Sequence, residues 1–322
     1  MKAEMKHSQA GVVLIAVLWG VLLMAAIAFT LATSVRVGVD EVHNRKESLQ
    51  AYYLARGAVY QAALTMTASQ TAKANSGYQQ GQRSIEWTSG PNRITVELCD
   101  EAGKIDLNKA SDTVLLRLFM ALGLEFTDAR ALTDAVEDWR DPDSETRPLG
   151  AEDSYYLTLP QPYRAANADF RSVEELLLVR GVTQDLYYGR YIVHDDGTVE
   201  RLPGLEDCLT VFGTGQAVNI NYAPYPVLMA LPGMQAQVAN YIIAGRQQKP
   251  FVAVSDITRE FPVSLGAESI SSMSAQTSIN VSLVARATAV DGISARVRAV
   301  VQFKASDAGP FRILTWDDSY VH

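Results

Sequence analysis

Residues 12–29 read VVLIAVLWGVLLMAAIAF, a run of eighteen residues without one charged side chain. About 20 apolar residues are enough to cross a bilayer as a helix. Three explanations are open: a cleaved secretory signal, a plain membrane anchor, or a short leader removed ahead of an anchor that stays. Lys2, Lys6 and His7 precede the run and oppose only Glu4, so the positive-inside rule predicts a cytoplasmic N-terminus and a body on the other side.

The sequence that follows the apolar run favours one long helix. Residues 35–73 contain no proline and carry apolar side chains at helical spacing. We therefore predict a helix of roughly 90 Å from about Val12 to about Ala72, ended by the polar loop that begins at Asn75. A cleaved signal has a shorter apolar core, and the ATS at residues 32–34 is a poor cleavage site.

Composition limits the class of protein. The chain has 322 residues, of which 48% are hydrophobic and 20% charged, as expected for a globular body with a real core. Its net charge of −8 argues against nucleic acid as the main partner, because phosphate binding needs a basic face. GxSxG, HExxH and glycine-rich phosphate loops are absent from the sequence, so we do not expect an enzyme.

Short strands are expected at both ends of the body. Residues 84–100 hold two alternating runs around SGPN, which predicts a β-hairpin. Residues 278–290 and 295–305 alternate in the same way on either side of Asp291–Gly292, a strong hairpin turn. Residues 312–318, RILTWDD, predict one more short strand. Strands at the edges and helices between them indicate an α+β protein.

The middle of the chain is expected to be mainly helical and internally repeated. IDLNKASDTVLLRL at 105–118 matches VNINYAPYPVLMAL at 218–231, and DFRSVEEL at 169–176 matches PFVAVSDI at 250–257. Residues 170–193 are expected to form helix, glycine turn, helix. Such units resemble helix–hairpin–helix or SAM-like domains. Their LPGM-type turn is a weak signal for DNA, which the scarcity of Lys and Arg around it opposes.

An acidic loop is the sharpest chemical feature. Within residues 137–156, the sixteen residues 138–153 crowd six carboxylates into a segment broken by proline and glycine. Calcium suits such a loop, because it takes six to eight oxygen ligands. Salt bridges to Arg140 and Arg147 are the rival explanation. The metal ligands expected from this loop are Asp138, Asp141, Asp143, Glu152 and Asp153.

The two cysteines, Cys99 and Cys208, lie shortly before equivalent points of the two repeats. If the body lies outside the cytoplasm, one disulfide between them is the simple expectation. The alternative is a pair of unpaired, buried thiols.

Taken together, these features resemble the minor pseudopilin K family of type II secretion. The residues that carry the resemblance cover nearly the whole chain: GVVLIAVLW (11–19), AYYLARGA (51–58), DEAGKIDLNKAS (100–111), DWRDPD (138–143) with GAEDSYY (150–156), and VNINYAP (218–224) with LPGM (231–234). The resemblance implies a pilin-like fold, a long N-terminal helix packed on an antiparallel sheet, interrupted by a large α-helical insertion. It also implies bound calcium.

The resemblance further implies that a prepilin peptidase cuts after Gly11 and leaves Val12 as the mature, methylated N-terminus. Most pilin-like proteins carry a glutamate as the fifth mature residue, where this chain has Ala16. The K subunit is the family's exception, and a subunit at the tip gains nothing from a costly carboxylate at membrane depth. The implied partners are pseudopilins I and J at the tip, H below them, the inner-membrane assembly platform and exported substrates.

The implied organisation is a single-pass inner-membrane protein with a periplasmic body. Two alternatives stay open: a minor pilin of a type IV pilus-like system, and a membrane-tethered helix–hairpin–helix DNA receptor. The expected segments are a leader (1–11), a membrane part of the long helix (12–34), the first part of the pilin-like domain (35–102), a first SAM-like domain (103–205), a second SAM-like repeat (206–264) and C-terminal pilin strands (265–322).

Overall fold

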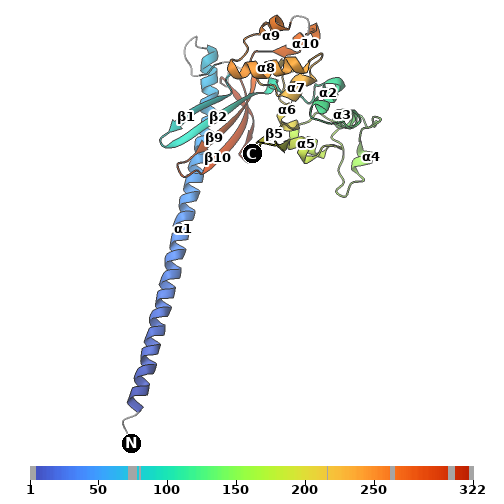
Figure 1. Cartoon of the computed structure of the whole chain (residues 1–322). Helices are drawn as coiled ribbons and strands as arrows, with labels where there is room; N and C mark the ends of the chain where they lie inside the picture. Colours follow the sequence, from blue (N-terminus) through green and yellow to red (C-terminus); the bar gives the residue numbers. More distant parts are fainter. Residues whose placement is uncertain are drawn as a thin grey trace.

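One helix sets the shape of the molecule. In the computed structural model, which describes residues 5–71, 78–79, 81–215, 217–261, 265–303 and 309–318, helix α1 (Met5–Thr71) runs as a straight stalk into a mixed head (Figure 1). The predicted long helix is therefore confirmed, and its 67 residues correspond to about 100 Å.

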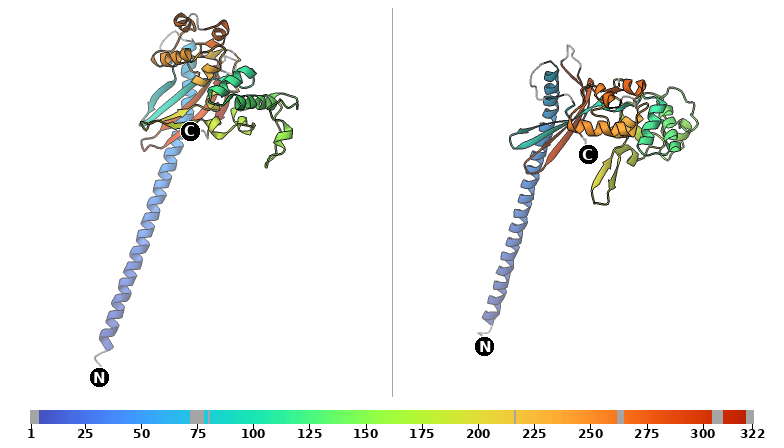
Figure 2. Two further views of the ribbon diagram at one scale, coloured as in Figure 1. Left: turned by 45° about the vertical axis from the view of Figure 1, so that its right-hand side comes forward. Right: turned by 45° about the horizontal axis from the view of Figure 1, so that its top comes forward.

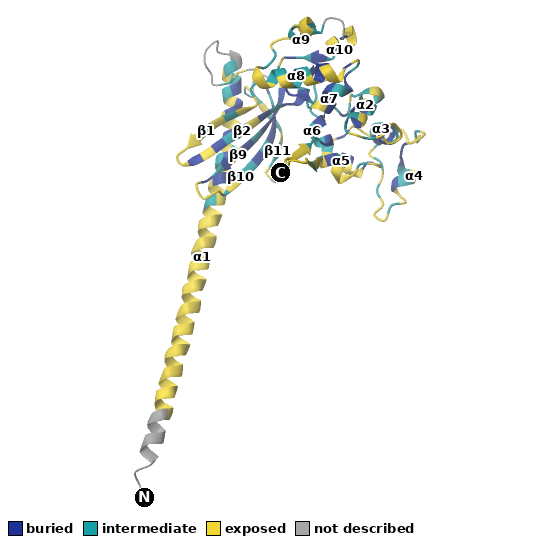
Figure 3. Ribbon diagram, viewed as in Figure 1, coloured by how far each residue is buried: buried dark blue, intermediate teal, exposed yellow. Residues whose placement is uncertain are grey.

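The two halves of α1 differ in what they meet. In the N-terminal half, residues 12–46 are exposed throughout, with side chains such as Leu14 and Phe29 about 70% accessible (Figure 3). In the other half Ala51, Ala55 and Ala62 are buried, because their small side chains let the helix approach the sheet closely. Within the described residues α1 is the one helix long and apolar enough to cross a membrane.

A five-stranded antiparallel sheet packs against the upper half of α1. Its strands are β1 (Ser84–Ser89), β2 (Asn92–Asp100), β9 (Asn280–Thr288), β10 (Ser294–Gln302) and β11 (Arg312–Asp317), in the order β1-β2-β9-β10-β11. Alternate residues such as Val96, Leu283 and Val297 face the helix and form the core of the pilin-like part. Both predicted hairpins and the predicted last strand are confirmed.

The chain between β2 and β9 forms a second body with its own apolar core (Figures 1 and 2). Its elements are η1 (Glu101–Gly103), β3 (Ile105–Asp106), α2 (Asp112–Ala121), α3 (Phe126–Arg140), α4 (Asp153–Tyr156), η2 (Val173–Leu178), α5 (Gln184–Tyr188), β4 (Arg190–Val193), β5 (Val199–Leu202), α6 (Leu205–Cys208), β6 (Leu209–Thr210), β7 (Val218–Asn219), α7 (Tyr225–Ala230), α8 (Ala236–Gln248), α9 (Ser255–Glu260), α10 (Ala267–Ser271) and β8 (Met273–Ser274). We call residues 101–279 the helical insert.

The predicted internal repeat is present in the structure. Asn108 donates to the Phe170 carbonyl and accepts from its amide, and Asn221 makes the same pair of bonds with Phe251. Each repeat is closed by a short parallel pairing, β3 with β6 and β7 with β8. The sequence match therefore corresponds to two equivalent folding units.

Two details of the insert differ from expectation. Residues 190–193 are a strand of a hairpin and not a helix, because Gly189 takes φ +82° and the β-favouring side chains of Tyr191, Ile192 and Val193 follow it. Residues 265–275 belong to the insert and not to the pilin strands, since Leu265, Met273 and Ala275 lie in its core.

The insert and the sheet are joined by a buried polar cluster. Asp100, at the end of β2, accepts hydrogen bonds from Ser278 and Asn219. Glu101 accepts from the hydroxyls of Thr210 and Ser282, which come from opposite sides of the junction. Both carboxylates are at most 1% exposed, so the junction is a fixed part of the fold and not a loose linker.

Candidate functional site

The candidate site lies where the first repeat contains a long loop that the second repeat lacks. Helix α3 ends at Arg140 because Asp141 precedes Pro142, which disfavours helical backbone at that residue. The chain then runs through residues 141–169 before it reaches Phe170. In the second repeat only residues 249–250 separate α8 from the equivalent Phe251.

An aromatic cluster fixes the base of this loop. The ring of Trp139 lies 5.2 Å from that of Tyr156 and 6.2 Å from that of Tyr163. It also stacks on Phe170 at 6.4 Å. Because these rings come from α3, α4 and the end of the loop, they hold the acidic segment against the helix.

Asp138 and Asp134, one helical turn apart on α3, hold the loop by its backbone. Both carboxylate oxygens of Asp138 lie 3.2 Å from the Arg147 amide, and Asp134 Oδ2 accepts from the Leu149 amide at 3.2 Å. A side chain at Gly150 would place its Cβ 2.1 Å from Asp138 Oδ2, so this approach requires glycine. Both aspartates are buried, and burial raises the pKa of Asp138.

Glu152 is the most perturbed group of the loop. It is 2% exposed, and neither of its carboxylate oxygens has a hydrogen-bond partner among the residues that the structure describes. Burial, followed by the charges of Asp138 and Asp141, raises its pKa to about 7. Asp141 Oδ1 is likewise buried without a partner, and burial raises the pKa of Asp141 as well. Asp138, Asp141 and Glu152 are therefore acids that are linked through their charges.

Two arginines supply positive charge beside these carboxylates. The Arg147 guanidinium lies 3.6 Å from Asp138, 3.8 Å from Glu137 and 3.9 Å from Asp141. These are long ion pairs, and Arg147 Nε is itself buried without a hydrogen bond. Arg140 instead pairs closely with Glu137, at 2.5 Å, and donates to the carbonyls of Leu107 and Ala110.

The structure brings together some of the expected ligands and separates others. The charge of Asp141 contributes to the raised pKa of Asp138, and the charges of both contribute to the raised pKa of Glu152, which places the three carboxylates within electrostatic reach. Asp143 is exposed and accepts from the amide of Glu145, beside Asp141. Asp153 is engaged elsewhere, since it pairs with Arg164 at 2.5 Å and accepts from the Ala165 amide.

Three residues at the site, Asp134, Glu137 and Asn167, were not among the metal ligands expected from the sequence. Asp134 and Glu137 precede the loop on α3, and their positions among buried apolar residues of the helix were the available signal. Asn167 has φ 43°, a conformation rare outside glycine, and donates to the Asp143 carbonyl while its own Oδ1 is buried without a partner. No sequence signal marked Asn167.

The donor set suits a hard cation. The unpartnered buried oxygens of Glu152, Asp141 and Asn167 are the kind of ligand calcium takes. Across the residues described, no three His, Cys, Asp or Glu side chains are already gathered around one point as a metal would require. The chemistry of the donors fits calcium, while Arg147 takes part of the cationic role in this arrangement.

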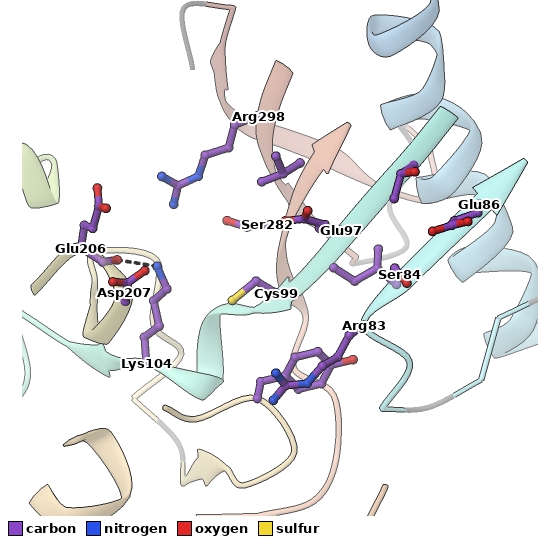
Figure 4. Close-up of a pocket in the computed structure, with 14 residues that line it drawn as sticks. Arg83, Ser84, Glu86, Glu97, Cys99, Lys104, Glu206, Asp207, Ser282 and Arg298 are labelled. Atoms are coloured by element: carbon purple, nitrogen blue, oxygen red, sulfur yellow. Dashed lines mark hydrogen bonds between the residues drawn. The ribbon is translucent and has the colours of Figure 1, made fainter. Parts of the chain in front are cut away.

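The expected disulfide is not formed: both cysteines are free thiols. Cys99 lies on β2 and lines a cavity of about 570 Å³ between the sheet and the insert, beside Lys104 and Ser282 (Figure 4). Cys208 ends α6 and is fully buried in the core of the insert. Cys99 thus belongs to the sheet and Cys208 to the core of the insert. Burial raises the pKa of each thiol.

The LPGM turn buries its two ends, Leu231 and Met234, in the insert and exposes Gly233. Leu231 is 4% exposed, and its carbonyl accepts from the Arg117 guanidinium of α2. Pro232 accepts from the Ser269 hydroxyl of α10. The turn that grips phosphate in some helix–hairpin–helix proteins is thus occupied here by neighbouring elements of the same chain.

Comparison with known proteins agrees with the fold and with the repeats. Two family models described as type II secretion system (T2SS), protein K match residues 95–189 and 218–280. Type II secretion system protein K of Pseudomonas aeruginosa is 29% identical over 180 residues, which are 53% of this chain and 49% of that protein. The Klebsiella pneumoniae protein of the same name is 28% identical over 202 residues, 57% of this chain and 61% of that protein. The chain spans about half the length of the curated relatives it matches.

A solved structure shares the architecture. The crystal structure of the GspK-GspI-GspJ complex from the enterotoxigenic Escherichia coli type 2 secretion system contains a chain that superposes with a TM-score of 0.59 at 16% identity. The match covers 87% of this chain and all of that one. At this identity the likeness establishes the fold. The two domain matches and the curated relatives show, in addition, that residues 95–189 and 218–280 are similar in sequence to type II secretion system protein K.

Proposed function

We propose that this chain is the minor pseudopilin K of a type II secretion system and caps the tip of its pseudopilus. It is a structural subunit and not an enzyme, and it starts assembly together with pseudopilins I and J, with H linking them to the shaft. The observation that carries the proposal is the placement of the helical insert between β2 and β9, on a head that also packs the long helix α1.

The size and placement of the helical insert support a position of this subunit at the tip of the pseudopilus. It forms a body with its own core that extends away from the sheet and the stalk (Figure 2). A filament of pilin-like subunits packs their stalk helices side by side, so a body of this size is accommodated best where no subunit follows. The rigid junction through Asp100 and Glu101 keeps the insert in that position.

The stalk supports membrane anchoring and processing. The exposed apolar half of α1 suits a single-pass anchor. We propose that it lies in the inner membrane with a cytoplasmic N-terminus and a periplasmic body, and that prepilin peptidase cuts between Gly11 and Val12. The assembly platform then extracts the subunit.

Sequencing the N-terminus of the protein extracted from membranes tests the processing. A free or methylated Val12 is expected. A protein that begins at Met1 indicates a plain anchor, and one that begins near Val35 indicates a signal peptide; either result contradicts the proposal.

We further propose that the acidic loop binds calcium through Asp138, Asp141 and Glu152, with Asp143 beside them. The support is the buried oxygens of Glu152 and Asp141 that no donor among the described residues satisfies, and the position of Asp138 within electrostatic reach of both. Calcium would supply the positive charge that these carboxylates need and would tie the loop to α3. Isothermal titration of the detergent-solubilised full chain with calcium, against the Glu152→Gln variant, measures this directly.

Assembly is tested by mixing the full chain with the separately purified heads of pseudopilins I and J in the presence of calcium. A stable complex by size-exclusion chromatography is expected. Binding to a type IV minor pilin in place of I and J would favour that alternative. A gel shift with duplex DNA at physiological salt would favour a DNA receptor, which the net charge of −8 and the contacts of the LPGM turn with Arg117 and Ser269 oppose.

A further inference from the structure

One hairpin of the insert exposes an apolar face that the fold itself does not explain. Strands β4 and β5 form a separate two-stranded sheet with both outer edges unpaired in the sheet topology of the described chain. Figure 2 shows this hairpin extending away from the body of the insert. It also lies between the ranges matched by the two family models, which end at residue 189 and resume at residue 218.

The exposed face is apolar. Directly paired residues of an antiparallel ladder share a face, so the pairs Tyr191–Arg201 and Val193–Val199 lie on the same side. On that side Tyr191 is 70% exposed, Val193 73% and Val199 63%. Isolated two-stranded sheets are marginal in water, and adjacent exposed β-branched and aromatic side chains mark an interaction site.

The hairpin is nevertheless held in one position. At its base Gly189 and Gly204 meet so closely that a Cβ on either would lie within 2.3 Å of backbone atoms. Arg201 bridges the base, since it donates to the Tyr188 carbonyl at 2.6 Å and pairs with Glu206 and Asp207 at 2.8 and 3.0 Å. The apolar face is therefore presented in a fixed geometry, which lowers the entropy cost of binding.

The tip of the hairpin is equally well formed. Asp196 Oδ1 accepts from both the amide and the hydroxyl of Thr198. His194 lies 2.9 Å from Glu200 across the strands. These hydrogen bonds hold the tip in one conformation. The apolar side chains are therefore exposed on an ordered surface, as expected where a partner covers them.

Charge narrows the choice of partner. Asp195 and Asp196 lie in the turn at the far end of the apolar face, whereas His194 and Glu200 alternate onto the opposite face and pair with each other. A second copy of this chain would bring the same acidic tip and a net charge of −8, so like charges would face each other. A complementary partner presents an apolar patch with lysine or arginine at its rim.

We propose that the apolar face of the β4–β5 hairpin is the docking surface for the head of a neighbouring pseudopilin subunit, which offers an apolar patch rimmed by basic side chains. The proposal rests on the proposed function, because it takes its partner from the same filament. A single rigid face suits a subunit that is always met in one orientation, whereas varied cargo would need an adaptable surface.

The test replaces the two valines by threonine, which keeps their shape and their preference for strands but removes apolar surface. The full chain in detergent is titrated with fluorescent heads of pseudopilins I and J. The Val193→Thr/Val199→Thr variant is expected to bind one of these heads about tenfold more weakly than wild type. Asp195→Lys is expected to weaken the same complex about threefold and to reduce its dependence on salt.

Two equally exposed valines elsewhere provide matched controls. Val290, 71% exposed at the β9–β10 turn, and Val252, 63% exposed after α8, are replaced by threonine in the same way. The affinity of these variants for both heads is expected to be unchanged. Far-ultraviolet circular dichroism and thermal unfolding identical to wild type show that the hairpin variant is folded.

Each other outcome overturns the proposal in a recognisable way. If wild type binds neither head, both the proposed function and the hairpin proposal fail. If wild type binds and the double variant binds equally well, the hairpin proposal alone fails. Loss of self-association by the double variant identifies a second copy as the occupant. Loss of export with unchanged binding of the heads identifies cargo as the occupant.

Discussion

The two repeats of the helical insert share the same hydrogen bonds from an arginine to backbone carbonyls, but they differ in the charged side chains around that arginine. In the first, Arg140 donates to the carbonyls of Leu107 and Ala110; in the second, Arg246 donates to those of Ile220 and Ala223, at 2.7 and 2.6 Å. These carbonyls occupy matching positions of the repeat. An arginine from the second helix thus locks the entry turn of each unit.

The difference lies in the surroundings of each arginine. Arg140 has Glu137 as a carboxylate partner, and the acidic loop begins directly after it. Arg246 is bonded to carbonyls, and its pKa is lowered to about 10 by burial and then by the charge of Arg83. The first repeat thus carries additional charged groups. The second repeat is a compact connector between the first repeat and the sheet.

The largest expected effect on stability comes from replacing Arg140 or Arg246, the arginine that bonds to backbone carbonyls in each repeat. Arg140→Met removes the close partner of the buried Glu137 carboxylate and leaves it only the long ion pair with Arg147, so we expect it to lower the free energy of unfolding by about 3–5 kcal/mol. Arg246→Met leaves only carbonyls without a donor and is expected to cost about 1–2 kcal/mol. Urea denaturation of the full chain in detergent measures both, with the exposed Arg259→Met as the control. Equal losses at the two positions would contradict this distinction between the repeats.

The equivalent asparagines Asn108 and Asn221 test whether the two repeats are stabilised in the same way. Asn108→Ala and Asn221→Ala each remove the two hydrogen bonds to the backbone of a phenylalanine, so each is expected to cost about 2–3 kcal/mol. Asn221 also donates to the Ala275 carbonyl, which makes its loss the larger of the two. The same denaturation assay applies, and Asn44→Ala on the exposed stalk is the matched control. A loss at only one position would argue against equivalent units.

The acidic loop gives the first repeat a pH dependence that the second lacks. The pKa of Glu152 is near 7 in the folded protein and near 4.5 in the unfolded chain, so between these values the folded state holds a proton that the unfolded state has lost. Without calcium, stability is therefore expected to fall by about 1–3 kcal/mol as the pH rises from 5 to 7.5.

Calcium and one substitution separate the causes of that pH dependence. Saturating calcium is expected to restore the stability lost at pH 7.5 and to have little effect at pH 5, where Glu152 is protonated. Glu152→Gln is expected to flatten the pH profile and to weaken the response to calcium. Thermal unfolding at both pH values with calcium or with a chelator measures these effects. A calcium response of the same size at pH 5 and pH 7.5 would contradict the role of Glu152.

The smallest expected effect tests whether Arg147 and a bound calcium ion compete for the same carboxylates. Arg147 lies within 4 Å of Asp138 and Asp141, so its guanidinium competes with a bound cation. Arg147→Met is expected to tighten calcium binding by about 1 kcal/mol, roughly fivefold, by isothermal titration. Arg164→Met, which removes only the partner of Asp153, is the control. Weaker binding by the Arg147 variant would show that the arginine supports the site and does not compete with the ion.

Local patterns in the sequence predicted much of the fold and one part of the site. The helical spacing of α1, the SGPN and Asp291–Gly292 turns and the IDLN and VNIN repeats all act within a few residues, so they could be read directly. The acidic loop was found in the same way. The helix expected over 190–193 was wrong because glycine at 189 and the strand preferences after it outweighed a helical spacing.

The amino-acid sequence by itself determined the long stalk, the two hairpins and the doubled unit, because each depends on periodicity or on short-range turn chemistry. Only the tertiary structure decided which carboxylates meet, that Asp153 turns to Arg164, and that Cys99 and Cys208 lie in separate bodies as free thiols. It alone placed the buried oxygens of Glu152 and the exposed face of the β4–β5 hairpin. These features depend on packing between segments far apart in the chain, which no local pattern encodes.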